Sequence, residues 1–198
     1  MTIHAYYGDI SHLKNEQKMF DDLLTQLKLH WGNSEDWIYL FYNTMWSGQE
    51  IDVIAFTKEA IVVSDLKNYS GNLVGSENGE WQINGELEVQ GGSQINPFVQ
   101  IRKNRFAVLE WFKSAELFTD QNLGFISGCI ILNELSSTQM DLSHSVRKWF
   151  YVTDIANSVD TLSRLHTKGI SLASDDILYL VNKLKLKEYS WDQGVAPR

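Results

Sequence analysis

Apolar residues recur with a helical period in some parts of the chain and with a strand period in others. From Ser11 to about Trp31 they repeat every three to four positions, and Glu16 falls on the same stripe, which predicts an amphipathic helix. Asn96-Pro97 predicts the start of a helix that continues to about Leu117, because asparagine is favoured at the N-cap and proline at the first helical position. Two later helices are expected, from Asp154 to about His166 and from Ser174 or Asp175 to about Leu186.

Short runs of β-branched and aromatic residues predict the strands of one sheet. They are Trp37–Tyr42, Glu50–Phe56, Ala60–Lys67, Gly124–Leu132 and Lys148–Val152. We expect Asn68, Ser70 and Gly71 to end the third strand. Asn84-Gly85 predicts the turn of a short hairpin inside a polar surface insertion over 72–95. This order favours an α/β sandwich, a mixed β-sheet flanked by helices, with a hairpin insertion and extra C-terminal helices.

Composition narrows the class of protein. The 198 residues are 43% hydrophobic, enough for a substantial core in one domain. The net charge of −8 argues against a surface built throughout to hold nucleic acid. Cys129 is the only cysteine, so neither an internal disulfide nor a zinc site is expected. With no signal peptide or apolar span in the sequence, we expect a cytoplasmic protein that does not bind membranes.

The second and third strands carry the candidate chemistry. Alternate residues of a strand share a face, so Asp52 joins Ile54 and Phe56 on one strand, while Asp65 and Lys67 share a face of the next. A tight turn at 57–60 would place Asp52 opposite Asp65. Directly opposed side chains lie roughly 4.5–5.5 Å apart at Cβ, where like charges destabilise the pair. A divalent cation would offset the repulsion, and an exposed, solvated strand face is the alternative.

Two residues from other elements favour the cation. Glu16 lies on the buried stripe of the first helix, where a charge needs a partner unless its carboxylate reaches solvent. Gln100 lies one turn into the helix that begins at Pro97, on a line that faces the sheet. A glutamine there can position a water or a phosphate, although an isolated glutamine is more often an ordinary surface residue.

Taken in order, these residues resemble the nuclease-related domain (NERD) family of the PD-(D/E)xK nuclease superfamily. The matching segments are Glu50-Ile-Asp52-Val-Ile, Ile61-Val-Val-Ser-Asp65-Leu-Lys67-Asn-Tyr-Ser-Gly71, Trp81 and Asn96-Pro97-x-x-Gln100, preceded by the helix with Glu16. The resemblance implies a restriction-endonuclease-like core over 11–155, and we expect 156–198 to form a helical extension packed on it.

The resemblance also implies roles for these residues. Asp52, Asp65, Glu16 and the backbone carbonyl of Leu66 would hold Mg²⁺, for which Mn²⁺ is a possible substitute. Lys67 would position or activate the attacking water, and Gln100 would be the glutamine of the NPxxQ segment. Such an ion supplies a nucleophile and neutralises charge on the phosphate.

Substrate binding is expected on the helix after Pro97, where Arg102, Lys103 and Arg105 form a basic stretch. The same residues would also suit an ordinary solvated face. The leading hypothesis is a metal-dependent deoxyribonuclease that cuts or nicks DNA, with repair and genome defence as candidate settings. The alternative is a catalytically weak nucleic-acid-binding or adaptor subunit that acts with a partner such as a helicase.

Overall fold

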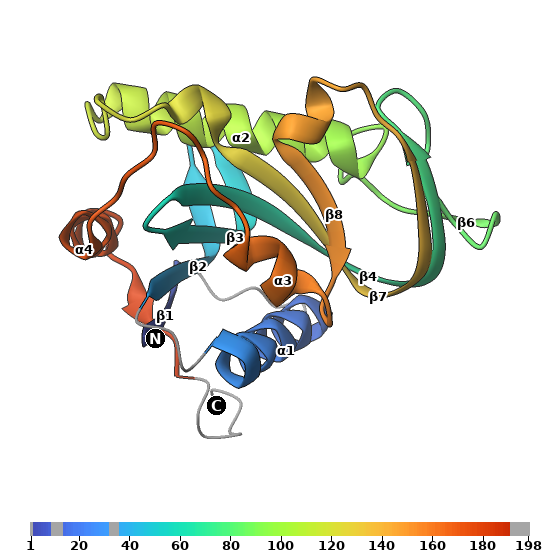
Figure 1. Ribbon diagram of the computed structural model, residues 1–198, viewed down its shortest axis with the longest axis horizontal. Helices are drawn as coiled ribbons and strands as arrows, with labels where there is room; N and C mark the ends of the chain where they lie inside the picture. The colour runs from blue at the N-terminus through green and yellow to red at the C-terminus, as the bar shows by residue number, and fades with distance from the viewer. Residues whose placement is uncertain (1, 9–13, 32–35, 191–198) are drawn as a thin grey trace.

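The computed structural model describes residues 2–8, 14–31 and 36–190. The strands are β1 (Thr2–Tyr7), β2 (Trp37–Trp46), β3 (Gln49–Thr57), β4 (Ala60–Ser76), β5 (Gln82–Ile83), β6 (Leu87–Glu88), β7 (Ser127–Asp141), β8 (Phe150–Asp154) and β9 (Lys187–Glu188). The helices are α1 (Lys14–Trp31), α2 (Pro97–Ser114), α3 (Ser158–Ser163) and α4 (Ser174–Lys183). Figure 1 shows α2 on one side of the sheet, with α1 and α3 on the other.

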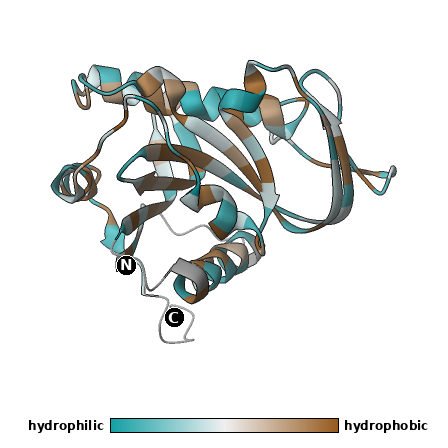
Figure 2. Ribbon diagram, in the orientation of Figure 1, coloured by the Kyte–Doolittle hydropathy of each residue, from teal (hydrophilic) through white to brown (hydrophobic). Residues whose placement is uncertain are grey.

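Two hydrophobic cores hold these layers together. One contains Phe98, Val108 and Phe112 of α2, and the other contains Phe20 and Leu23 of α1, each packed against one face of the sheet. The central strands carry many of the hydrophobic residues, as Figure 2 shows. The predicted α/β sandwich with a mixed sheet is therefore confirmed.

The order of strands around β4 positions the candidate site. β4 pairs with β3 antiparallel on one edge and with β7 parallel on the other, while β2 joins β3 to β1. The predicted hairpin register is confirmed from Phe56 opposite Ile61 to Val53 opposite Ser64, where the ladder ends. Asp52 and Asp65 are therefore one position beyond the last pair.

β4 is much longer than predicted. Asn68, Ser70 and Gly71 do not end it, and the strand continues to Ser76 because β7 pairs with it as far as Asp141. The second half of β4 also packs on the hairpin insertion: a Cβ on Gly75 would lie 2.8 Å from the ring of Trp81, which is fully buried. Polar sequence alone indicated a loop here, whereas pairing on a neighbouring strand makes it a strand.

Several element boundaries also differ from the sequence expectations. β1 was not predicted, and β2 continues past Tyr42 to Trp46. Asp154 does not cap a helix but ends β8, and its carboxylate accepts hydrogen bonds from the backbone N–H groups of Leu135 (3.0 Å) and Asn157 (2.9 Å). Helix α3 consequently begins at Ser158. The expected start of the first helix at Ser11 lies outside the described residues.

The C-terminal part of the chain returns to the sheet. β9 pairs with β1, and the ring of Tyr189 packs on Phe20 at 5.1 Å. Leu172 donates a backbone hydrogen bond of 2.9 Å to Lys58 in the β3–β4 turn. None of the helices within the described ranges is long and apolar enough to cross a membrane.

Asn96 joins α2 to the hairpin insertion through side-chain hydrogen bonds, so its substitution should lower the stability of the protein. Its buried side chain accepts a hydrogen bond from Val99 N (2.8 Å), as a helix N-cap does, and its amide donates to Gly79 O (2.7 Å). We expect Asn96→Ala to lower the free energy of unfolding by about 2–4 kcal/mol, since a lost N-cap costs about 1 kcal/mol and an unpaired buried carbonyl about 1–3. Urea unfolding followed by tryptophan fluorescence measures it. The exposed Asn68→Ala is the control, and equal midpoints for the two variants would contradict the assignment.

Candidate functional site

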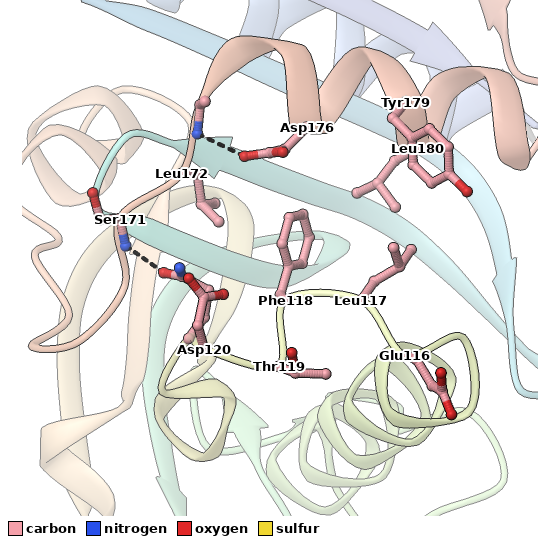
Figure 3. Close-up of a pocket in the computed structure, with 12 residues that line it drawn as sticks. Glu116, Leu117, Phe118, Thr119, Asp120, Ser171, Leu172, Asp176, Tyr179 and Leu180 are labelled. Carbon is pink, nitrogen blue, oxygen red and sulfur yellow. Dashed lines mark hydrogen bonds between the residues drawn. The ribbon is translucent and has the colours of Figure 1, made fainter.

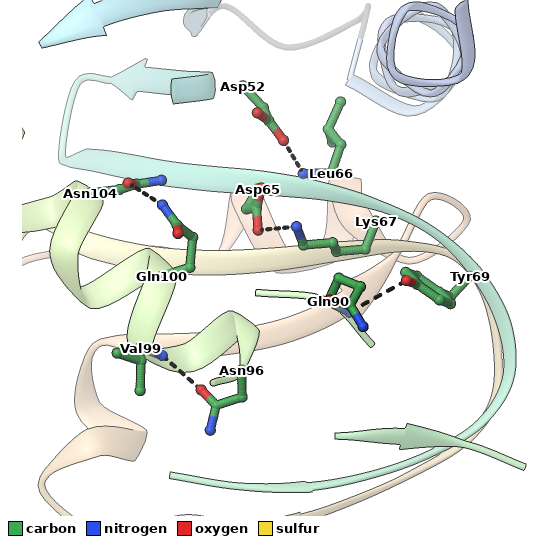
Figure 4. Close-up of polar contacts among 10 residues, drawn as sticks. All are labelled: Asp52, Asp65, Leu66, Lys67, Tyr69, Gln90, Asn96, Val99, Gln100 and Asn104. Atoms are coloured by element: carbon green, nitrogen blue, oxygen red, sulfur yellow. Dashed lines mark hydrogen bonds and ion pairs between the residues drawn. The ribbon is translucent and has the colours of Figure 1, made fainter. Parts of the chain in front are cut away.

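The candidate site lies where β3 separates from β4. Beyond the last ladder pair, the carboxylate of Asp52 replaces the backbone of β3 and accepts a hydrogen bond of 2.8 Å from Leu66 N, drawn in Figure 4. In an antiparallel ladder a residue directs its N–H and C=O groups to the same neighbour. The carbonyl oxygen of Leu66 therefore faces the same side of β4 as Asp52.

Asp65 and Lys67 lie on the face of β4 that α2 covers. Every second residue of a strand shares a face, and Ile61 and Val63 of the same series belong to the core beneath α2. The side chain of Asp65 is buried, and its Oδ2 forms an ion pair of 2.9 Å with Lys67 Nζ. Burial alone would lower the pKa of Lys67, but the charge of Asp65 outweighs it and raises that pKa above its usual range. Lys67 is therefore an ammonium at neutral pH and a hydrogen-bond donor.

Asp52 is the most perturbed carboxyl group of the site. Burial raises the pKa of Asp52 well above its ordinary value, and the charge of Asp65 raises it further, although the hydrogen bond from Leu66 opposes both effects. Asp65 is buried and Asp52 is partly buried, and two carboxylates held together with little access to water are unfavourable unless a cation accompanies them. Lys67 supplies one positive charge for these two negative ones.

Glu16 approaches the same place from α1. It is partly buried in the first turn of α1, and its charge is among the causes that raise the pKa of Asp52 and of Tyr42. Four residues later, the ring of Phe20 stacks on Tyr42 at 4.4 Å. The structure thus brings Glu16, predicted from the helical stripe, near Asp52.

Gln100 extends from the first turns of α2 toward β4 (Figure 4). Its Nε2 donates a hydrogen bond of 2.8 Å to Oδ1 of Asn104, which is itself buried. The sequence provided no separate indication of a role for Asn104. The hydrogen bond fixes the orientation of the Gln100 amide, so Asn104 supports the site.

The three predicted phosphate ligands have different environments. Arg102 and Lys103 are exposed on α2. Arg105 instead donates a hydrogen bond of 2.6 Å to Ile126 O and stacks its guanidinium over Trp149 at 3.6 Å. Burial lowers the pKa of Arg105 to about 10, which leaves it charged at neutral pH. Its contacts within the chain tie α2 to the start of β7.

The donor set fits a hard divalent cation. Within the described ranges no group of three or more His, Cys, Asp or Glu side chains is assembled for a metal. Mg²⁺ does not need such a group, since it is typically held by one or two carboxylates and keeps several waters. Asp52, Asp65 and the Leu66 carbonyl are oxygen donors of this kind. The observation that favours a cation is that the buried carboxylate of Asp65 lies beside the partly buried one of Asp52.

A pocket of about 370 Å³ lies elsewhere, between the loop after α2 and helix α4 (Figure 3). Its loops are held together by backbone hydrogen bonds to side chains, from Ser171 N to Gln121 (2.6 Å) and from Ala173 N to Asp176 (3.1 Å). It contains none of the residues around Asp52. The candidate site remains the pair Asp52 and Asp65, whose carboxylates interact with each other and with Lys67.

Comparison with protein families supports this placement. The nuclease-related domain (NERD) family matches residues 12–133, more than half of the chain and the segment that contains Glu16, Asp52, Asp65, Lys67 and Gln100. The chain belongs to this family. No curated protein and no solved structure matches it.

The perturbed pKa of Asp52 predicts how stability depends on pH without divalent ions. Because the folded-state pKa is raised, the cost of charging Asp52 is absent below its ordinary pKa and grows as pH rises above it. We expect Asp52→Asn to increase the free energy of unfolding at pH 7.5 by about 1 kcal/mol or more, since each pKa unit corresponds to about 1.4 kcal/mol. Urea unfolding in EDTA at pH 4, 5.5 and 7.5 measures it.

The increase in the free energy of unfolding caused by Asp52→Asn should become smaller as the pH is lowered toward 4. The exposed Asp175→Asn serves as the control, with little change at any pH. A variant at position 52 that is less stable than the parent at pH 7.5 would show that the carboxylate is not under strain.

Proposed function

We propose that this protein is a divalent-cation-dependent nuclease that hydrolyses phosphodiester bonds in DNA. The observation that carries the proposal is the junction of β3 and β4, where Asp52, Asp65 and Lys67 are brought together beside the Leu66 backbone. Membership of the nuclease-related domain family supports it. A purely structural role would not require a buried carboxylate, a second partly buried one and a lysine together, because such a group is costly to bury.

In this proposal Asp52, Asp65 and the Leu66 carbonyl hold Mg²⁺ or Mn²⁺, with Glu16 adding negative charge from α1. When bound, the ion supplies an activated water and neutralises charge on the phosphate. Lys67, held by Asp65 at 2.9 Å, donates a hydrogen bond to the phosphate oxygen on which charge develops. Gln100, oriented by Asn104, positions the attacking water or the phosphate.

The DNA backbone would approach along α2. Arg102 and Lys103 are exposed there, within one turn of Gln100. Arg105 contributes indirectly, because its guanidinium is engaged with Ile126 and Trp149. A few phosphate contacts suit a protein whose total charge is −8, since most of its surface does not attract DNA.

Cleavage assays test the proposal. We expect the purified protein to cut supercoiled plasmid, linear duplex or single-stranded DNA with Mg²⁺ or Mn²⁺, and not in EDTA. Asp65→Asn and Lys67→Met should each lower the cleavage rate at least about 100-fold, because each removes a group acting on the reacting phosphate or its cation. The exposed Asp175→Asn, which makes the same change of charge on α4, should cleave like the parent.

A parent protein that cuts none of these substrates with either cation would contradict the nuclease. That result would favour the adaptor hypothesis, in which the same surface binds nucleic acid beside a partner such as a helicase. Equal rates for parent, Asp65→Asn and Lys67→Met would place any activity elsewhere.

The two exposed cations of α2 give a separate prediction. The double variant Arg102→Ala, Lys103→Ala should weaken DNA binding and reduce its salt dependence by about two in the slope of log K against log[salt], since each phosphate contact contributes about one. Fluorescence anisotropy in Ca²⁺ over a range of salt concentrations measures it. The pair Lys183→Ala, Lys185→Ala removes the same charge near the end of α4 and should leave the slope unchanged. An identical slope for the α2 variant would remove α2 from the DNA interface.

A further inference from the structure

Near the candidate site, three buried side-chain oxygens of the described structure have no hydrogen-bond partner apart from one ion pair. They are Tyr42 Oη, Ser64 Oγ and Asp65 Oδ2, the last of which is paired with Lys67 as an ion. Two lie on the face of the sheet that α1 covers and one on the face that α2 covers. Tyr42 pairs with Val53 across β2 and β3, and Val53 pairs with Ser64 across β3 and β4. Buried polar groups are almost always satisfied, so a cluster of exceptions around a candidate site indicates a missing ligand.

Tyr42 is the most informative of the three. Its side chain is 3% exposed, and its ring is held between Phe20 (4.4 Å, stacked) and Tyr189 (5.9 Å, edge-on). This packing fixes the direction of the hydroxyl group. Burying a hydroxyl without a hydrogen bond costs about 1–3 kcal/mol, which phenylalanine at the same position would avoid.

The other well-packed tyrosines satisfy their hydroxyl groups. Tyr39 Oη lies 2.6 Å from Ser174 Oγ, Tyr189 donates to Asp21 at 2.7 Å, and Tyr151 donates to Lys148 O at 3.3 Å. Tyr42 therefore differs from its neighbours, since Tyr39 lies on the same strand and Tyr189 packs against the ring of Tyr42, and the hydroxyl groups of both have partners. The unpaired hydroxyl is a property of this position and not of tyrosine burial in the fold.

Tyr42 adjoins both acidic elements of the site, through its strand pairing and through its ring contact. Val53, its partner on β3, is adjacent to Asp52, while Phe20, which stacks on its ring, is one helical turn after Glu16. Burial raises the pKa of Tyr42, and Glu16 and Asp52 are among the charges that raise it further. The group is therefore a proton donor at neutral pH.

We propose that Tyr42 is a positioning residue of the cation site, whose hydroxyl donates a hydrogen bond to an oxygen in the coordination shell of the ion held by Asp52 and Asp65. This inference rests on the proposed function and adds a residue to it from β2, outside the strands that carry the family's motif. The hydroxyl orients that oxygen and stabilises its negative charge. Partners of this kind typically change metal affinity 10–100-fold when they are removed.

Tyr42→Phe tests the proposal, because it removes one oxygen and keeps the ring between Phe20 and Tyr189. Thermal unfolding is measured in EDTA and over a titration of Mn²⁺, without DNA. We expect the variant to be as stable as the parent in EDTA, or more stable, and to need about 10-fold more Mn²⁺ for half of the thermal stabilisation. Tyr39→Phe is the matched control. It removes the hydrogen bond to Ser174, so it should lower stability in EDTA and leave the Mn²⁺ dependence unchanged.

The outcomes separate this inference from the proposed function. If Mn²⁺ stabilises the parent and Tyr42→Phe at the same concentrations, Tyr42 does not contact the coordination shell, while the cation site stands. If Mn²⁺ does not stabilise the parent, the cation site and the role of Tyr42 are both wrong. A loss of stability for Tyr42→Phe in EDTA would show that the hydroxyl has a structural partner.

Cleavage kinetics provide a second measurement. Tyr42→Phe should lower kcat at limiting Mn²⁺ and regain most of the parental rate at saturating Mn²⁺, with KM for DNA unchanged. A higher KM for DNA at every Mn²⁺ concentration would instead place the hydroxyl against the substrate and overturn the proposed role.

Discussion

The hydrogen bond between Leu66 N and Asp52 marks the point on which the rest of the structure depends. Up to Ser64, the edge of β4 is satisfied by β3, and from Leu73 it is satisfied by β5 of the hairpin insertion. Between these partners the carboxylate of Asp52 takes the place of a backbone carbonyl. The opening allows side chains to reach the middle of a sheet that is otherwise covered by helices on both faces.

β7 makes this opening possible without breaking the sheet. It pairs with β4 along both halves, with register shifts between Lys67 and Ser70 and between Gly71 and Asn72, so β4 keeps the same neighbour on this edge while its other partner changes. Arg105 ties α2 to the start of β7, and Asn96 ties α2 to the hairpin insertion. The elements that surround the site are thus fixed by contacts that lie outside it.

The apolar packing that stabilises the fold lies away from the site, whereas the polar groups that are costly to bury lie within it. The two hydrophobic cores are well packed, whereas Asp65 and the hydroxyl of Tyr42 are buried at a cost and Asp52 is held beside Asp65 at a cost. Natural proteins commonly retain such costs where a ligand is bound, because the ligand removes them. The sequence already indicated the two carboxylates, since strand alternation and the tight turn at 57–60 predicted Asp52 opposite Asp65. In the structure the ladder ends one position before them.

The sequence by itself determined the local elements and the register of the hairpin, because hydrophobic period, the Asn96-Pro97 cap and turn length act over a few residues. It also indicated Asp52, Asp65, Lys67, Glu16 and Gln100. Only the tertiary structure decided that β4 extends to Ser76 and that Tyr42 lies beside Val53. It also decided that Asp154 ends β8 and accepts a hydrogen bond from Leu135, and that Arg105 donates to Ile126. These depend on which strands become neighbours, and strand pairing joins residues far apart in the chain, which no local pattern records.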